Sequence, residues 1–182
     1  MKTSKHEVWQ RGPLPAIPAL LQPVAHALLQ ASEEVSELME SFPAELLWER
    51  PANMASPGFH LQHLAGVLDR VFTYARNEGL TAAQFEYLAA EGKDSEPSYQ
   101  TAALVSRFDK QVHSAIEQLK ATREEELTAY RSVGRAGLPS TVIGLLVHGA
   151  EHTMRHVGQL LVTVAVIRYN ADLDTPLEEQ IK

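Results

Sequence analysis

The sequence predicts an all-α protein, a four-helix bundle with one additional short helix. Apolar residues recur at intervals of three and four residues in four long segments, the spacing of one face of a helix. Proline and glycine mark the breaks between these segments. No segment shows a convincing strand pattern. A chain of 182 residues suits one domain with a hydrophobic core of its own.

Three parts are expected along the chain. Residues 1–23 contain four prolines and predict an extended, proline-containing N-terminal arm, because proline restricts the backbone and lacks an amide donor. Residues 24–169 carry the helical pattern and form the bundle. Residues 170–182 are acidic and polar, which predicts a loosely ordered C-terminal tail.

The predicted helices after the first each begin at a serine or threonine, whose hydroxyl caps a helix N-terminus. In chain order we expect helices over 24–39, from Ser56 to about 77, over 81–90, from Ser98 to about Tyr130, and from Ser140 to Tyr169. Pro57 strengthens the second start, because proline is favoured in a first turn. The connection between the second and third long helices is the longest, so a crossover is considered beside simple up-and-down topology.

Composition excludes several classes of function. A net charge of −7 without a cluster of lysine and arginine argues against a nucleic-acid partner. Histidine, glutamate and arginine interrupt the most apolar stretch, 142–167, so it predicts a buried helix and no membrane span. No apolar segment follows the first residues, so we expect no signal peptide and a cytoplasmic protein. The chain has no cysteine, so a reacting thiol must come from outside.

Five of the eight histidines fall in two helical clusters, His60 with His63 and His148 with His152 and His156. Side chains four residues apart lie on one helix face, with Cβ atoms roughly 5–6 Å apart, so two imidazoles can bind one ion. His148 and His156 are about 12 Å apart along the helix axis, too far to share an ion. Spacing leaves open either pair on the last helix, and either His60 or His63 as a third ligand.

Two segments resemble motifs of the DinB-like superfamily. Residues His148–Leu160 are similar to its C-terminal signature, in which a histidine, three residues, a second histidine and one residue precede Gly-Gln. Residues Phe59–Arg70 are similar to its other motif, in which a histidine precedes a short apolar stretch. The similarity extends from about Val24 to Tyr169. Val157 departs from the pattern, since many relatives carry arginine there.

The resemblance implies a four-helix bundle that holds a divalent metal, with nickel or zinc favoured, on His63, His152 and His156. Relatives with assigned activities include thiol-dependent transferases or isomerases and metal-dependent hydrolases. Three neutral imidazoles leave a coordination position open, where water or a thiol can be deprotonated. We therefore expect a transferase that conjugates an external low-molecular-weight thiol to a small-molecule electrophile.

Alternatives to this function are a metal-dependent hydrolase and a non-catalytic metal-binding protein of the stress response. The sequence does not identify catalytic residues beyond the metal ligands. The resemblance also implies a homodimer.

Further expectations concern the surroundings of the metal. Gly66 lies one turn after His63, where a missing side chain would leave room for water or substrate. Arg70 is expected to form a salt bridge or to be exposed to solvent more readily than to bind an anionic substrate. A ligating imidazole usually donates its second N–H to a carboxylate, carbonyl or water. The acidic residues available by type are Glu33, Glu34, Asp69 and Glu151.

Overall fold

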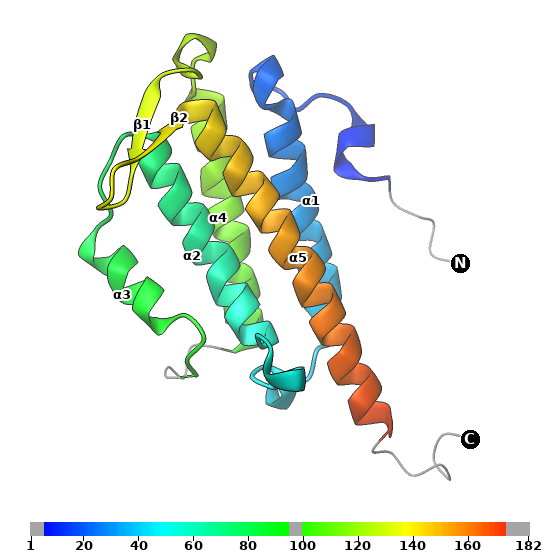
Figure 1. The fold of residues 1–182 in the computed structure, drawn as a ribbon. Helices are drawn as coiled ribbons and strands as arrows, with labels where there is room; N and C mark the ends of the chain where they lie inside the picture. Colours follow the sequence, from blue (N-terminus) through cyan, green and yellow to red (C-terminus); the bar gives the residue numbers. More distant parts are fainter. Residues whose placement is uncertain (1–5, 95–99, 174–182) are drawn as a thin grey trace.

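The helical class predicted from the sequence is confirmed. The structure is a computed structural model that describes residues 6–94 and 100–173. Within these residues the helices and strands are α1 (Gln22–Met39), α2 (Pro57–Ala75), α3 (Ala82–Ala90), α4 (Thr101–Ala121), β1 (Tyr130–Val133), β2 (Leu138–Thr141) and α5 (Val142–Leu173) (Figure 1). The four long helices and the short α3 correspond to the predicted elements.

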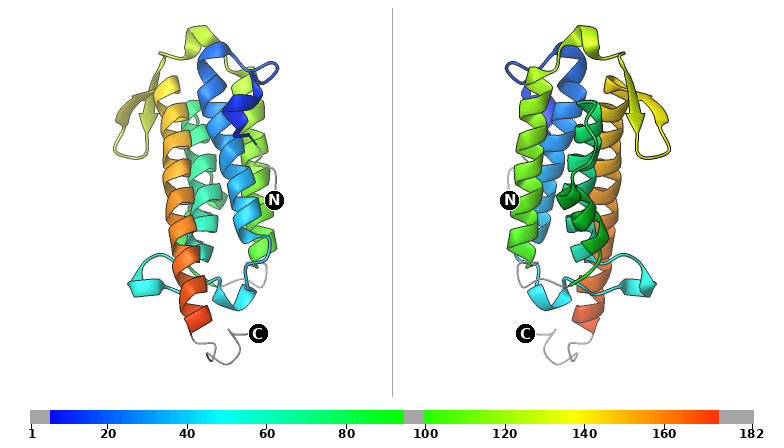
Figure 2. Two further views of the ribbon diagram at one scale, coloured as in Figure 1. Left: turned by 90° about the vertical axis from the view of Figure 1, so that its right-hand side faces the viewer. Right: turned by 90° about the vertical axis from the view of Figure 1, so that its left-hand side faces the viewer.

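The four long helices pack side by side. Helices α1 and α2 each contact both α4 and α5 (Figure 2). The chain descends through α1, rises through α2 and again through α4, and descends through α5 (Figure 1). Between the parallel neighbours α2 and α4, the chain returns through α3, which packs on α2. The long connection is therefore a crossover, and the topology is not simply up and down.

The core lies between the apolar faces of these helices. Its largest fully buried side chains include Leu28, Leu64, Phe72, Phe108 and Leu146. Burying such a side chain contributes about 1.5–3 kcal/mol, so the shared core is the main force that brings the helices together.

Helices α2 and α5 approach closely at Gly149. A Cβ atom added to Gly149 would lie 3.2 Å from Cε2 of Phe72 on α2 and 3.5 Å from Cγ1 of Val71. The absence of a side chain at Gly149 therefore permits this close packing. Because Gly149 lies one turn before His152, the approach also sets the separation of the two helices at the histidine clusters.

Two of the predicted helix starts are confirmed. Ser56 Oγ accepts a hydrogen bond from the backbone N–H of Phe59, and Thr81 forms a reciprocal capping box with Gln84. Pro57 occupies the first turn of α2, as expected.

The other two starts were not reproduced as predicted. Ser98 lies outside the described residues, and α4 begins at Thr101. Ser140 lies in β2, where it does not cap the helix; Thr141 Oγ1 instead accepts a hydrogen bond from Gly144 N at 3.1 Å.

The expectation of no strand was wrong, and so was the extension of the third long helix to Tyr130. Helix α4 ends at Ala121, and Tyr130 begins an antiparallel hairpin in which it pairs with Thr141. The turn contains Gly134 and Gly137 with φ of 66° and 62°, left-handed conformations that glycine adopts at little cost. Strands of four residues are too short to show a clear alternation of apolar and polar side chains.

The arm over 1–23 is more structured than expected in its described part. It forms short 3-10 helices at Val8–Arg11 and Ala19–Leu21, and α1 already begins at Gln22. The side chains of Val8, Ile17 and Leu21 are buried, so this segment packs on the bundle.

At the other end, α5 extends to Leu173, and the rest of the expected tail lies outside the described residues. The division into three parts stays a prediction. No helix in the described part of the chain combines the length and apolar character needed to cross a membrane.

Candidate metal centre

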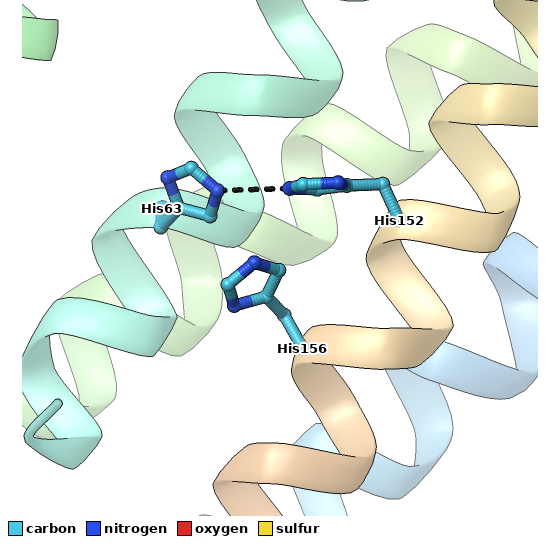
Figure 3. Close-up of side chains that lie close together, drawn as sticks. All are labelled: His63, His152 and His156. Atoms are coloured by element: carbon cyan, nitrogen blue, oxygen red, sulfur yellow. Dashed lines mark hydrogen bonds between the residues drawn. The ribbon is translucent and has the colours of Figure 1, made fainter. Parts of the chain in front are cut away.

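The three histidines implied as ligands lie together at the interface of α2 and α5. His63 comes from α2, and His152 and His156 come from successive turns of α5. One ring nitrogen from each lies within 4.8 Å of the others. Figure 3 shows the three rings turned toward one another across the interface. Two residues of one helix face and one of its neighbour thus form a single cluster.

The spacing of the ring nitrogens fits a shared ion. His63 Nε2 and His152 Nε2 are 3.0 Å apart. Nitrogen ligands at about 2.0–2.1 Å from a tetrahedral ion lie roughly 3.3 Å from each other. His152 Nδ1 is buried and, among the described residues, has no hydrogen-bond partner. An ion bound at Nε2 would place the proton of His152 on this Nδ1, so the fit to a metal rests on the spacing of the Nε2 atoms and on the donor set.

Glu91 orients His63. Its Oε2 accepts a hydrogen bond from His63 Nδ1 at 2.7 Å, and its Oε1 accepts one from Arg70 Nη1 at 2.7 Å. The Glu91 side chain is 6% exposed. Because a carboxylate only accepts, Nδ1 of His63 carries the proton and Nε2 presents its lone pair to the cluster. This is the second interaction that metal-bound imidazoles characteristically make.

The crossover delivers Glu91 to this position. Glu91 follows the last residue of α3, and the next residue, Gly92, has φ of 81°. Gln62 on α2 is fully buried; its Oε1 accepts from Gly92 N at 2.6 Å and its Nε2 donates to Lys93 O at 3.3 Å. Tyr87 Oη donates to Gln62 O at 3.1 Å. Hydrogen bonds on both sides therefore hold Glu91 against α2.

Sequence reasoning missed Glu91, because it lies in a polar segment that resembled a flexible connection. The acidic residues expected instead have other partners. Asp69 accepts from Gln84, Glu33 from Arg11, Glu34 from Gln30 and Glu151 from Arg155. No pattern in the sequence indicates Glu91, because it is 28 residues from His63.

The expectation that Gly66 leaves open space was wrong. A Cβ atom there would clash with Glu91 Oε1 and would lie 2.7 Å from Arg70 Nη1. The space at Gly66 is therefore filled by the ion pair that supports His63. The expected salt bridge of Arg70 is confirmed, with Glu91 as its partner.

His60 and His148 take positions beside the cluster. His60 is 3% exposed, and its Nδ1 is 3.2 Å from His156 Nδ1. A His156 that binds an ion through Nε2 can donate its Nδ1–H to His60, which then orients the ligand. The side chain of His148 is 52% exposed, and its ring centroid lies 5.3 Å from that of His152. Which histidines bind an ion stays a prediction.

Burial lowers the pKa of three histidines at the site. It lowers the pKa of His156 to about 4, and the charges of His63 and His152 add to this effect. Burial, with a contribution from His63, also lowers the pKa of His60 to about 4. The pKa of His152 is lowered by burial first and by His63 and His148 next. Neutral imidazoles can bind a cation near pH 7 without first releasing a proton.

The fold and the site together define a helical protein with a three-histidine cluster between two long helices. Residues 27–160 match the sequence model of the DinB superfamily, and this segment includes all three histidines. The chain belongs to the DinB superfamily.

Two solved structures share the fold. A conserved protein from Enterococcus faecalis superposes with a TM-score of 0.64 at 17% identity, over 81% of this chain and 96% of that one. A DinB-like protein from Bacillus cereus ATCC 10987 gives 0.56 at 16% identity, over 80% and 91%. At these identities the likeness shows the fold alone. No curated protein matches the chain.

Proposed function

We propose that the protein binds a divalent metal, nickel or zinc, on His63, His152 and His156 and conjugates an external low-molecular-weight thiol to a small electrophile. The observation that carries this proposal is the convergence of three imidazoles within 4.8 Å at the α2–α5 interface. A neutral ligand set leaves the charge of the ion uncompensated and a coordination position open.

The bound ion would supply Lewis acidity, lowering the pKa of a thiol or water at its open position. The protein supplies orientation. Glu91 fixes the proton of His63 on Nδ1, and His60 is placed to accept the Nδ1–H of His156. The chain has no cysteine, so the reacting sulfur belongs to a second substrate.

A hydrolase is the less favoured alternative, because it needs a base beside the attacking water. Glu151, the candidate by sequence, forms an ion pair with Arg155 and lies 3.6 Å from Nδ1 of His148. Glu91 accepts a hydrogen bond from His63 and forms an ion pair with Arg70. Both carboxylates are engaged, whereas transfer of a thiol that has lost its proton needs no such base.

The test begins with metal analysis of the purified protein, with His152→Ala as a variant that should lose the ion. Wild type is then assayed with cysteine, glutathione and coenzyme A against 1-chloro-2,4-dinitrobenzene. In this reaction a C–S bond forms, the C–Cl bond breaks, chloride leaves and the thiol proton goes to solvent. A metal-dependent rate supports the proposal.

Three results contradict the transferase. The first is the absence of a stoichiometric ion from well-folded protein. The second is hydrolysis of 4-nitrophenyl acetate without any thiol transfer, which favours the hydrolase. The third is an inactive protein that loses much of its thermal stability on chelation, which favours the non-catalytic metal-binding role.

The proposal extends to how the protein works in the cell. We propose a homodimer that acts on a small molecule and uses neither nucleic acid nor a membrane. The net charge of −7 supports the exclusion of nucleic acid, and exposed apolar side chains on α5, such as Leu161 and Tyr169, support self-association. Light scattering measures the oligomeric state. The cytoplasmic location stays a prediction, tested by cell fractionation.

A further inference from the structure

A cavity of about 400 Å³ lies next to the histidine cluster, between α5 and the residues that precede α2. Its volume lies within the roughly 300–1,000 Å³ of typical small-molecule sites. His60 lines the cavity and also contacts the ring of His156. Gly158 and Gln159, which follow His156 on α5, line it as well. His60 thus connects this cavity to the candidate metal centre.

The cavity wall is mainly apolar with one cationic side chain. Met54 and Val162 are 63% and 60% exposed and form apolar wall, and Gln159 and Arg155 contribute polar groups. Among the described residues that line the cavity, Arg155 is charged and none is a carboxylate. This lining favours a ligand with an apolar body and an anionic end.

Arg155 can bind an anion while it is paired with Glu151. The ion pair with Glu151 uses the Nη2 group of Arg155. A guanidinium carries five N–H donors in a planar arrangement, so donors at Nη1 and Nε are left for a second acceptor. Since Glu151 offsets part of the cationic charge, its removal should strengthen the attraction for an anion.

A larger cavity of about 570 Å³ has less suitable chemistry. It lies between α1 and α4, and Glu40 and Asp109 contribute carboxylates to its lining. Its described lining contains no histidine. It therefore has no connection to the proposed reaction.

We infer that the cavity beside His60 is the binding site of the electrophilic substrate, a small molecule with an apolar, aromatic-sized body and a carboxylate or sulfonate directed at Arg155. This inference rests on the proposed transferase function. It adds the position of the electrophile and the class of molecule that the site takes.

Gly158 offers a substitution that fills the cavity without disturbing its neighbours. A Cβ atom added there meets no heavy atom within 4 Å. Leucine is also a better helix former than glycine, so Gly158→Leu should keep α5 intact. Val147→Leu is the matched control, because it adds apolar volume to an exposed position of the same helix roughly 16 Å away along the axis.

The binding experiment uses two fluorescent probes with the same ring system, measured with the zinc-loaded protein. They are 8-anilinonaphthalene-1-sulfonate, an anion, and N-phenyl-1-naphthylamine, its neutral counterpart. We expect wild type to bind the anion more tightly and Gly158→Leu to weaken both probes by about tenfold or more. Arg155→Gln should weaken the anion alone, and Glu151→Gln should strengthen it. Val147→Leu should resemble wild type.

Two binding results overturn the inference. If Gly158→Leu binds the probes as wild type does, the cavity is not the site. If Arg155→Gln leaves the preference for the anion unchanged, the charge argument is wrong. The zinc content of each variant is measured alongside, so loss of metal is not mistaken for a filled cavity.

Kinetics separate this inference from the proposed function. With a metal-dependent rate established, 4-chloro-3-nitrobenzoate should show a lower KM than neutral 1-chloro-2,4-dinitrobenzene, and Gly158→Leu should raise KM for both. If kcat/KM of Gly158→Leu equals that of wild type although probe binding is lost, the electrophile binds elsewhere and the inference fails. If wild type has no metal-dependent rate, the proposed function fails, and the cavity has no role as the electrophile site. The probe affinities then still show whether the cavity binds an apolar anion.

Discussion

Glu91 Oε2 accepts a hydrogen bond from His63 Nδ1 at 2.7 Å, although the two residues lie 28 positions apart and on different elements. The crossover through α3 brings them together. One carboxylate therefore determines which nitrogen of His63 faces the cluster. It also neutralises Arg70, which is 8% exposed. The crossover thus supports the candidate metal centre as well as connecting two parallel helices.

Replacing Glu91 should weaken metal binding. We expect Glu91→Gln to lower the affinity for zinc by about 10–100-fold, the usual effect of removing the partner of a ligating imidazole. A glutamine retains the size of the side chain but not the charge that favours the Nδ1–H tautomer. Titration against a chromophoric chelator measures the affinity. Glu86→Gln, an exposed change on α3, is the control; equal affinities in the two variants would show that Glu91 does not act on the metal.

A side chain at Gly66 should destabilise the protein. Alanine is the better helix former by about 1 kcal/mol, yet its Cβ would displace the Glu91–Arg70 pair. We expect Gly66→Ala to lower the free energy of unfolding by about 1–3 kcal/mol, the usual cost of overpacking. Urea denaturation measures it. Gly158→Ala, where the added Cβ meets open space, should raise the same quantity by about 0.5–1 kcal/mol. A higher free energy of unfolding in both variants would contradict the packing argument.

The pair of ligands on α5 can be tested by substituting the two outer histidines. His148 is half-exposed and lies outside the three-histidine cluster, so His148→Ala should leave zinc affinity within about twofold of wild type. His156→Ala should remove a ligand and abolish stoichiometric binding, measured by elemental analysis after dialysis. If His148→Ala abolished zinc binding and His156→Ala did not, the ion would bind at His148 and His152.

Acid should destabilise the metal-free protein through two buried histidines. The pKa values of His60 and His156 are about 4, below the ordinary 6.5, because burial disfavours the charged form. Between pH 6.5 and 4 the unfolded chain binds protons that the folded chain does not. The free energy of unfolding therefore falls as the pH drops through this window, and these two groups contribute no slope above it.

Thermal unfolding in the presence of a chelator, followed from pH 7.5 to 4, measures this effect. The double variant with glutamine at both positions should show a shallower loss of stability than wild type. Identical slopes would mean that His60 and His156 titrate alike in the folded and unfolded chains.

Features within one or two helical turns followed from the sequence. The spacing of His152 and His156 places them on one face, because a helix turns once in 3.6 residues. Ser56 and Thr81 were recognisable as caps, because their hydroxyls bond to amides only three residues away. The helical class followed from apolar periodicity in the same way.

Tertiary structure decided which residues from separate elements meet. His63 and His152 are 89 positions apart, and the packing of α2 on α5 selects His63 for the cluster and places His60 against His156. Glu91 reaches His63 because the crossover folds back along α2. Such contacts depend on helix separation and chain path, which are set by the whole core and by no local spacing. Local periodicity therefore determined the helices and placed His152 and His156 on one face of α5, whereas packing between helices determined which histidines of α2 and α5 meet and which carboxylate supports them.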